Sequence, residues 1–230
     1  MREPLCISSR RRQFCPPNLP VATMKNLDRK KLSDVSFLVL DLSDWQVGYQ
    51  QLQHIRSHVN PEIYLKPVLF QGGTEVVPRE VLQAADGSIR LEDNDPEKMI
   101  NSWSSRFEKI NARIERLKKI SEDGDSNIAF KVLRFMDTRS AEFKPIPSAR
   151  KISGYIYPTL QPLFPKQDIG VLETLEYLES QKLITGKFVS RAYACTHCGC
   201  AFLNFFEICP DCSSSDLHTE ELIHHFRCAY

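Results

Sequence analysis

Two C-x-x-C pairs near the end of the chain constrain this sequence more than any other feature. The first pair is Cys195 and Cys198, the second is Cys209 and Cys212, and ten residues separate the two pairs. Two thiolates in one tight turn can reach the same ion, and two such turns complete the tetrahedron that Zn²⁺ prefers. Because all four expected ligands are thiolates, no coordination position is left open for a substrate or an activated water. The pattern therefore predicts a structural zinc ribbon without catalytic chemistry.

Free cysteines and a redox pair are the alternatives to zinc. Redox C-x-x-C motifs usually occur singly beside a βαβ unit, so two pairs at ribbon spacing favour a metal site. Six of the eight cysteines lie between Cys195 and Cys228, which indicates one local feature rather than a disulfide framework along the whole chain. We interpret Cys200 as a small packing residue. His225 and Cys228 have the spacing of half of a second metal site.

The compartment decides how close cysteine pairs are interpreted. No apolar run is long enough to span a bilayer, and the N-terminal MREPLCISSRRRQF lacks the apolar stretch of a secretory signal. We therefore expect a cytoplasmic protein with no membrane partner. In a reducing compartment, close cysteine pairs are more often metal ligands than disulfides.

Residues 1–95 have the pattern of an α/β domain. Residues 36–42 (SFLVLDL) form a continuous apolar run, which is typical of a strand covered on both faces in a parallel sheet. Residues 48–57 have helical spacing, and Asn60-Pro61 stops that helix. Residues 64–70 (YLKPVLF) form a second apolar run. Strand, helix and strand in this order predict a right-handed crossover in a parallel sheet.

A long amphipathic helix is predicted over residues 96–121, with Asp95 as N-cap and Pro96 in its first turn. Its apolar residues alternate in steps of three and four, as in a coiled coil: Ile100, Trp103, Phe107, Ile110, Ile114 and Leu117. Fewer than three heptads are present. Two interpretations therefore stay open, a helix packed on its own domain and a homodimer formed through residues 96–120.

Residues 127–194 have the pattern of a small winged-helix-like unit. A short helix over residues 128–139 and a short strand at 152–157 are followed by a helix that begins at Asp168. A strand over residues 187–194 then leads into the ribbon, residues 195–230. We expect the whole chain to be α/β followed by α+β.

From about Phe130 onward the chain resembles the thaumarchaeal output domain, a metal-binding output domain of signalling proteins. The segments that carry the resemblance are YP at 157–158, LEYLESQKLITGKFVSRAYACTHCG, LNFFEICPDC and ELIHHFRC. The resemblance implies that the four cysteines of the two pairs form the family's first metal site. It also implies that Cys228, with a neighbouring histidine, begins a second cysteine cluster. The family pattern continues with another C-x-x-C that this sequence lacks, so we expect the ribbon to be incomplete.

The N-terminal part resembles a receiver domain, in which Asp41 occupies the place of the phosphoacceptor. A receiver also needs an acidic pair after its first strand, and residues 4–11 have none. Its fourth strand should be followed by Ser or Thr, whereas Phe70 is followed by Gln71-Gly72-Gly73. Without these groups, metal-assisted phosphoryl transfer to Asp41 has little electrostatic support. We therefore expect a degenerate receiver-like scaffold.

These features favour a non-catalytic output or relay module that contacts a protein partner and contains structural Zn²⁺. The alternative is a zinc-ribbon and winged-helix regulator that binds nucleic acid. Against it, residues 195–230 contain one Arg, no Lys and five carboxylates, a poor balance for contacting phosphates. A basic surface would require the fold to gather upstream cations: Arg139, Lys144, Arg150, Lys151, Lys166, Lys182, Lys187 and Arg191. A third interpretation, a metalloenzyme, needs a cluster of histidines or of histidine and carboxylate with an open site, which His224-His225 alone does not supply. His54 and His58 are four residues apart, but the Asn60-Pro61 stop favours a solvated helix end.

Overall fold

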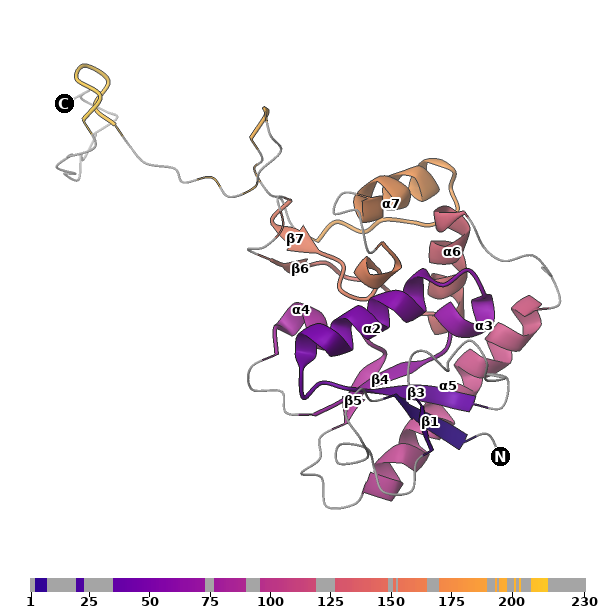
Figure 1. Cartoon of the computed structure of the whole chain (residues 1–230). Helices are drawn as coiled ribbons and strands as arrows, with labels where there is room; N and C mark the ends of the chain where they lie inside the picture. Colours follow the sequence, from indigo (N-terminus) through magenta and orange to yellow (C-terminus); the bar gives the residue numbers. More distant parts are fainter. Residues whose placement is uncertain are drawn as a thin grey trace, which may run out of the picture.

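The computed structural model describes residues 3–7, 20–22, 35–72, 77–89, 96–118, 127–148, 151, 153–164, 170–189, 193, 195–197, 201, 203 and 208–214. These residues form a parallel sheet with helices on both faces, followed by a mainly helical segment that packs beside it (Figure 1). No helix in the described ranges combines the length and the apolar character needed to cross a membrane.

The sheet has five parallel strands in the order β2-β1-β3-β4-β5. The strands are β1 (Glu3–Ile7), β2 (Val21–Ala22), β3 (Val35–Asp41), β4 (Val68–Gln71) and β5 (Gly87–Ile89). This order is the one found in doubly wound folds of the flavodoxin type. The predicted parallel α/β architecture is therefore confirmed for the N-terminal part of the chain.

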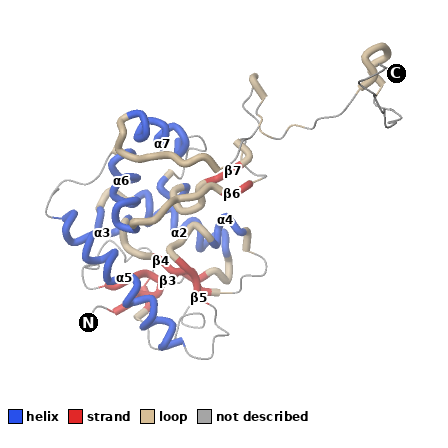
Figure 2. Tube along the Cα trace, turned by 180° about the vertical axis from the view of Figure 1, so that it is seen from behind, coloured by secondary structure: helices blue, strands red, loops and turns tan. Residues whose placement is uncertain are grey.

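The central strand β3 is buried on both faces, which explains its unbroken apolar sequence. Leu38 and Leu40 belong to the core cluster on the side of α2 (Trp45–Ser57). Phe37 and Val39 belong to the cluster on the opposite face, which α5 (Pro96–Lys118) covers. Figure 2 shows these helices on the two sides of the strands. The strand predicted over residues 36–42 thus matches β3 to within one residue at each end, and the helix predicted over residues 48–57 lies inside α2.

The second predicted strand begins four residues later than expected. Tyr64 ends a short helix, α3 (Pro61–Tyr64), and β4 begins only at Val68. The Asn60 side chain accepts a hydrogen bond from the Glu62 N–H at 2.9 Å, and Pro61 occupies the first turn. Asn60 and Pro61 therefore begin a new helix as well as ending α2, because both residues suit a helix N-terminus.

Helix α5 uses its apolar stripe inside its own chain. Phe107 and Ile114 are fully buried, and the Phe107 ring meets Phe37 edge-on at 5.4 Å between centroids. A Cβ atom added to Gly87 on β5 would lie 2.3 Å from Trp103, so the helix lies as close to the sheet as glycine permits. The structure thus agrees with the packed-helix interpretation. A homodimer through this helix would have to use a different face.

The C-terminal half contains α6 (Ile128–Arg139), the antiparallel strands β6 (Ile146–Pro147) and β7 (Tyr155–Ile156), a 3-10 turn η2 (Gln161–Leu163) and α7 (Gly170–Ser180). The prediction of α6 was correct to the residue. The predicted strand at 187–194 was wrong where it is described, since residues 185–189 and 193 have no regular structure. None of the described strands pairs with this segment, so its backbone has no ladder to join. A complete winged helix is not seen among the described residues.

The sheet unit and the C-terminal half share one hydrophobic core. Tyr64 and Leu65, which follow α2, pack with Val132 and Phe135 of α6 and with Leu160 beside η2. All five side chains have essentially no exposed surface. Burial of this kind contributes on the order of 25 cal/mol per Å² of apolar surface, so the shared core stabilises the contact between the two halves.

A buried cluster of three charges lies across the same contact. Asp86, which precedes β5, accepts from Arg56 Nη2 at 2.9 Å and from Arg139 Nε at 2.9 Å. Arg56 comes from α2 of the sheet unit, and Arg139 ends α6. Phe135 lies against both guanidinium groups, with its ring centroid 4.9 Å from Arg56 Cζ and 4.0 Å from Arg139 Cζ. Arg139 Nη1 also donates to the Leu65 carbonyl at 2.8 Å.

Burial and the neighbouring charges act in opposite directions on the pKa of Asp86. Burial alone would raise the pKa of Asp86, but the Arg139 and Arg56 guanidinium groups and the Val68 N–H lower it below the ordinary value of 3.8. Burial also lowers the pKa of Arg56 to about 9, partly offset by Asp86, so Arg56 stays charged at neutral pH. The cluster therefore consists of one carboxylate shared by two cations.

Replacing Asp86→Asn should lower the free energy of unfolding by about 3–5 kcal/mol at pH 7, because two buried guanidinium groups lose their counter-charge. The folded-state pKa of Asp86 is depressed, so this stabilisation is fully present above pH 3.8 and is lost as the pH falls through the lower folded value. Urea unfolding from pH 7 to pH 2 measures both effects. Asp137→Asn, on the exposed side of α6, is the matched control. A difference below about 1 kcal/mol at pH 7 would contradict this account.

Candidate functional site

Residues 208–214, which contain the second cysteine pair, form a tight loop. The Cys209 N–H donates to the Ser214 carbonyl at 2.9 Å, and the Ser213 N–H donates to the Cys209 carbonyl at 2.8 Å. Ser213 has a φ of 57°, in the left-handed region where glycine is the usual residue. The backbone therefore turns back on itself directly after Cys212, as a chelating C-x-x-C pair requires.

Hydrogen bonds within the loop also act on the Cys209 sulfur. Backbone N–H groups of Cys212 and then Asp211, together with the Cys212 side chain, lower the pKa of the Cys209 thiol. A thiolate is the form of cysteine that binds a metal ion. The donor set and the orientation of its N–H groups thus fit a thiolate-bound cation such as Zn²⁺.

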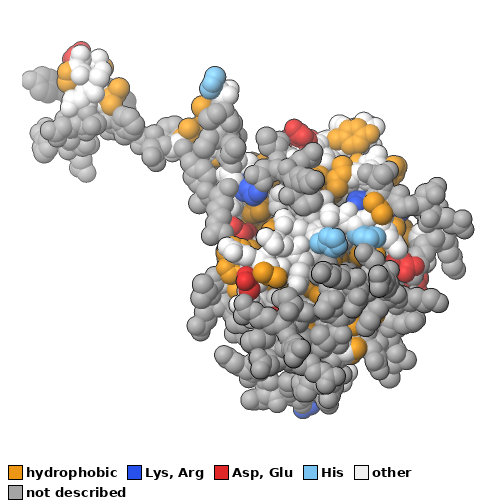
Figure 3. Space-filling view, in the orientation of Figure 1, with side chains coloured by type: hydrophobic (Ala, Val, Ile, Leu, Met, Phe, Trp, Pro, Cys, Tyr) orange, Lys and Arg blue, Asp and Glu red, His pale blue; other side chains and the backbone are white. Residues whose placement is uncertain are grey.

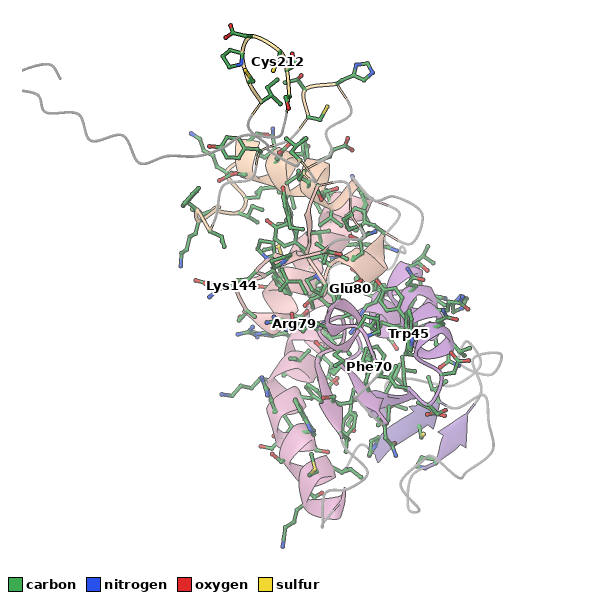
Figure 4. The ribbon with its side chains drawn as sticks, turned by 90° about the vertical axis from the view of Figure 1, so that its left-hand side faces the viewer. Trp45, Phe70, Arg79, Glu80, Lys144 and Cys212 are labelled. Carbon is green, nitrogen blue, oxygen red and sulfur yellow. The ribbon has the colours of Figure 1, made fainter. Side chains whose placement is uncertain are left out.

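Three predicted site residues, Cys198, His225 and Cys228, lie outside the described residues. Cys195 is described and partly buried, and Cys209 and Cys212 lie in one loop away from the sheet (Figure 4). Within the described ranges, no three His, Cys, Asp or Glu side chains are close enough to hold a metal. The four-cysteine site therefore stays a prediction.

One cysteine departs from the expectation of reduced thiols. Cys6, which is fully buried on β1, is disulfide-bonded. No cysteine spacing in the sequence predicted this bond. The available signal is that Cys6 and Cys15 are the two cysteines outside the C-terminal group of six.

Asp41 and Gln71 lie side by side at the carboxyl edge of the sheet. They are paired in register at the ends of β3 and β4. The Asp41 carboxylate accepts from the Ser43 N–H at 2.8 Å and from the Ser43 hydroxyl at 3.0 Å. Gln71 is 1% exposed, and neither polar atom of its side-chain amide has a hydrogen-bond partner among the residues that the structure describes. Ligands of doubly wound folds bind at this edge, so the position of Asp41 suits a site even though its carboxylate is enclosed.

Treatment with acetyl phosphate and Mg²⁺ should leave the intact mass of the protein unchanged. Asp41 is only 8% exposed and both its oxygens accept hydrogen bonds from Ser43, so attack on a phosphodonor is hindered. Mass spectrometry before and after incubation measures this. A phosphate adduct that disappears in Asp41→Asn would show that the receiver-like unit is a working receiver.

Three of the upstream cations that the structure describes are paired with carboxylates. Arg139 is committed to Asp86, while Lys144 and Lys187 both contact Glu142. These lysines lower the pKa of Glu142, and Glu142 raises the pKa of Lys187. Arg150, Lys166 and Arg191 lie outside the described residues. The basic surface that the nucleic-acid interpretation requires therefore stays a prediction, and the cations described here have carboxylate partners.

His54 lies in the last turn of α2, and His58 is the residue that caps it. Figure 3 shows two histidine side chains close together on the surface of the body. His58 Nδ1 accepts a hydrogen bond from the Asn60 N–H at 2.9 Å, so this imidazole helps to form the turn into α3. No third metal ligand accompanies the pair among the described residues.

Comparison with known proteins finds a family similarity in the C-terminal part of the chain. Residues 120–230 match the family model described as thaumarchaeal output domain 1, which confirms the family resemblance for this segment. The segment includes α6, α7 and both cysteine pairs. No curated protein and no solved structure matches the chain.

Proposed function

We propose, from the output-domain family to which residues 120–230 belong, that this chain is a non-catalytic relay module of a signalling protein. The N-terminal sheet unit receives an input, and the output domain passes it to a protein partner. The observation that carries this proposal is the buried contact between the two parts, made by Asp86, Arg56 and Arg139.

A second polar contact supports coupling between the two parts. Lys131 of α6 donates to the Ser57 carbonyl at 2.9 Å and to the His58 carbonyl at 2.7 Å. These carbonyls lie at the C-terminus of α2, where the last carbonyls have no partner within the helix and the helix dipole favours a cation. Helix α6 thus binds the end of α2 through Lys131 and the end of α3 through Arg139, which donates to the Leu65 carbonyl. A displacement of α2 or α3 would act directly on the output domain.

The strand order of the N-terminal unit supports a receiver-like origin. The order β2-β1-β3-β4-β5 is shared by flavodoxin-type folds, and Asp41 ends the central strand. Gln71 stands at the end of β4 where a receiver has a hydroxyl residue. We infer a scaffold that retains the receiver's shape and changes state without phosphorylation of Asp41.

The zinc site, in this proposal, is structural. Four thiolates from Cys195, Cys198, Cys209 and Cys212 would complete the coordination of Zn²⁺ and leave no position for a substrate. The tight loop at Cys209 and its N–H groups support metal binding at that half of the site. The role of the ion is then to fold the ribbon that presents the partner-binding surface.

Relay through the buried contact can be tested by hydrogen exchange. In Asp86→Asn, amide exchange should accelerate much more in α6 than in β1. Helix α6 is bound to Asp86 through Arg139, whereas β3 and β4 separate β1 from β5, which follows Asp86. Peptide-resolved mass spectrometry under native conditions measures both segments in one sample. Equal acceleration in the two segments would mean general destabilisation and would count against the relay.

Zinc binding can be tested with a matched pair of cysteine variants. The purified chain should contain about one zinc ion per molecule, and Cys209→Ser should lose most of it because one of four ligands is removed. Cys200→Ser, which lies outside both C-x-x-C pairs, should keep its zinc. Elemental analysis by mass spectrometry gives the zinc content of each protein. Retention of zinc by Cys209→Ser would contradict the four-cysteine site.

A further inference from the structure

A cavity of about 380 Å³ opens where the sheet unit, α5 and the output domain meet. Its walls come from Ala85 and Asp86 of the sheet unit, from one face of α5, and from the segment between Thr138 and Lys144. This volume is within the range of about 300–1,000 Å³ typical of small-molecule sites. The cavity touches all three parts of the proposed relay, so its occupant would contact each of them.

The charges around the cavity are predominantly positive. Five cations and two carboxylates line it: Arg106, Lys109, Arg113, Arg139, Lys144, Asp86 and Glu142. Asp86 is shared between Arg139 and Arg56, a further cation that lies behind the wall. Glu142 is similarly shared between Lys144 and Lys187. Neither carboxylate therefore neutralises the remaining cations.

Arg106 and Lys109 are the cations available to a ligand. They are one helical turn apart on α5, both are exposed, and neither makes an ion pair with any described residue. The guanidinium group of Arg106 lies 4.9 Å from the centre of the Trp103 ring, which supports it from one side. Lys144, on the opposite wall, projects outward (Figure 4).

Arg113 differs from these two because it has a structural role. Its Nη1 donates to the Asp137 carbonyl at 2.9 Å and also contacts the Ser140 hydroxyl. These groups lie at the C-terminus of α6, so Arg113 ties the output domain to α5. Its charge still adds to the potential of the cavity, because the groups it contacts are uncharged.

Apolar side chains complete the walls. Phe107, Ile110 and Phe143 line the cavity between the charged groups. Phe107 is fully buried, whereas Ile110 and Phe143 keep part of their surface accessible. A ligand that fits must therefore combine several negative charges with an apolar or planar part.

We propose that this cavity binds a small phosphorylated molecule of nucleotide size. Guanidinium and ammonium groups on one helix face suit the several oxygens of a phosphate chain, since arginine binds phosphate through paired hydrogen bonds. Phe143 and Ile110 provide the surface against which a planar base packs. A bound ligand holds α5 and the 138–144 segment together, so the relay responds to a metabolite as well as to a protein signal.

Isothermal titration calorimetry with pyrophosphate, ADP and adenosine tests the proposal on the full chain. We expect ADP and pyrophosphate to bind in low salt, ADP more tightly, with weaker binding as salt rises. Arg106→Gln combined with Lys109→Gln should weaken ADP binding at least tenfold, because each charge-assisted hydrogen bond contributes about that factor. Both side chains are exposed, so the fold should be retained, and circular dichroism verifies it.

The control removes the same charge elsewhere. Arg116→Gln combined with Lys182→Gln also deletes two exposed cations, but neither lines the cavity, so ADP binding should be unchanged. Equal losses in the two double variants would overturn the proposal, because net charge alone would then explain binding. The proposal would also be overturned if neither ADP nor pyrophosphate bound. So would duplex DNA that binds through Arg106 and Lys109 while pyrophosphate does not.

Discussion

The shared carboxylate of Asp86 is the interaction on which the joined architecture depends. It compensates the buried charge of Arg56 within the sheet unit and the charge of Arg139 at the end of α6. A buried cation without its counter-charge costs several kcal/mol, so neither arginine tolerates the loss of this carboxylate. Such pairs demand accurate geometry, and here they specify where α6 lies against α2 and β5. The shared apolar core then supplies most of the stabilisation.

The same geometry accounts for the cavity. Helix α5 crosses from the sheet to the output domain, where Arg113 reaches the last carbonyls of α6. With Arg139 turned inward to Asp86 and Arg113 turned toward α6, the exposed Arg106 and Lys109 remain beside the opening. The cavity at the contact of the two units is positively charged because these two cations remain beside it. The proposed ligand site and the proposed relay therefore lie at the same contact between the two units. Ligand binding depends on Arg106 and Lys109, whereas the relay depends on Asp86 and its two arginines.

Much of the fold could be predicted because its signals are local. The apolar run of β3, the period of α5 and the helical pattern of α6 each act within a few residues, and these three elements were confirmed. The strand predicted over residues 64–70 was wrong for residues 64–67, and the strand predicted over 187–194 was wrong where it is described. Both predictions rested on apolar content. Apolar content does not distinguish a strand from a buried turn or an exposed segment unless a neighbouring strand is available for pairing.

By itself, the sequence determined the parallel α/β character of the first part, the family of the second part and the cysteine pattern that predicts zinc. Tertiary structure alone decided which charges meet. Asp86 lies 30 positions from Arg56 and 53 from Arg139, and no local pattern relates the three. Periodicity and capping operate over a few residues, whereas the pairing of buried charges depends on how whole elements pack. The contact between the two halves, and the cavity within it, therefore became visible only in three dimensions.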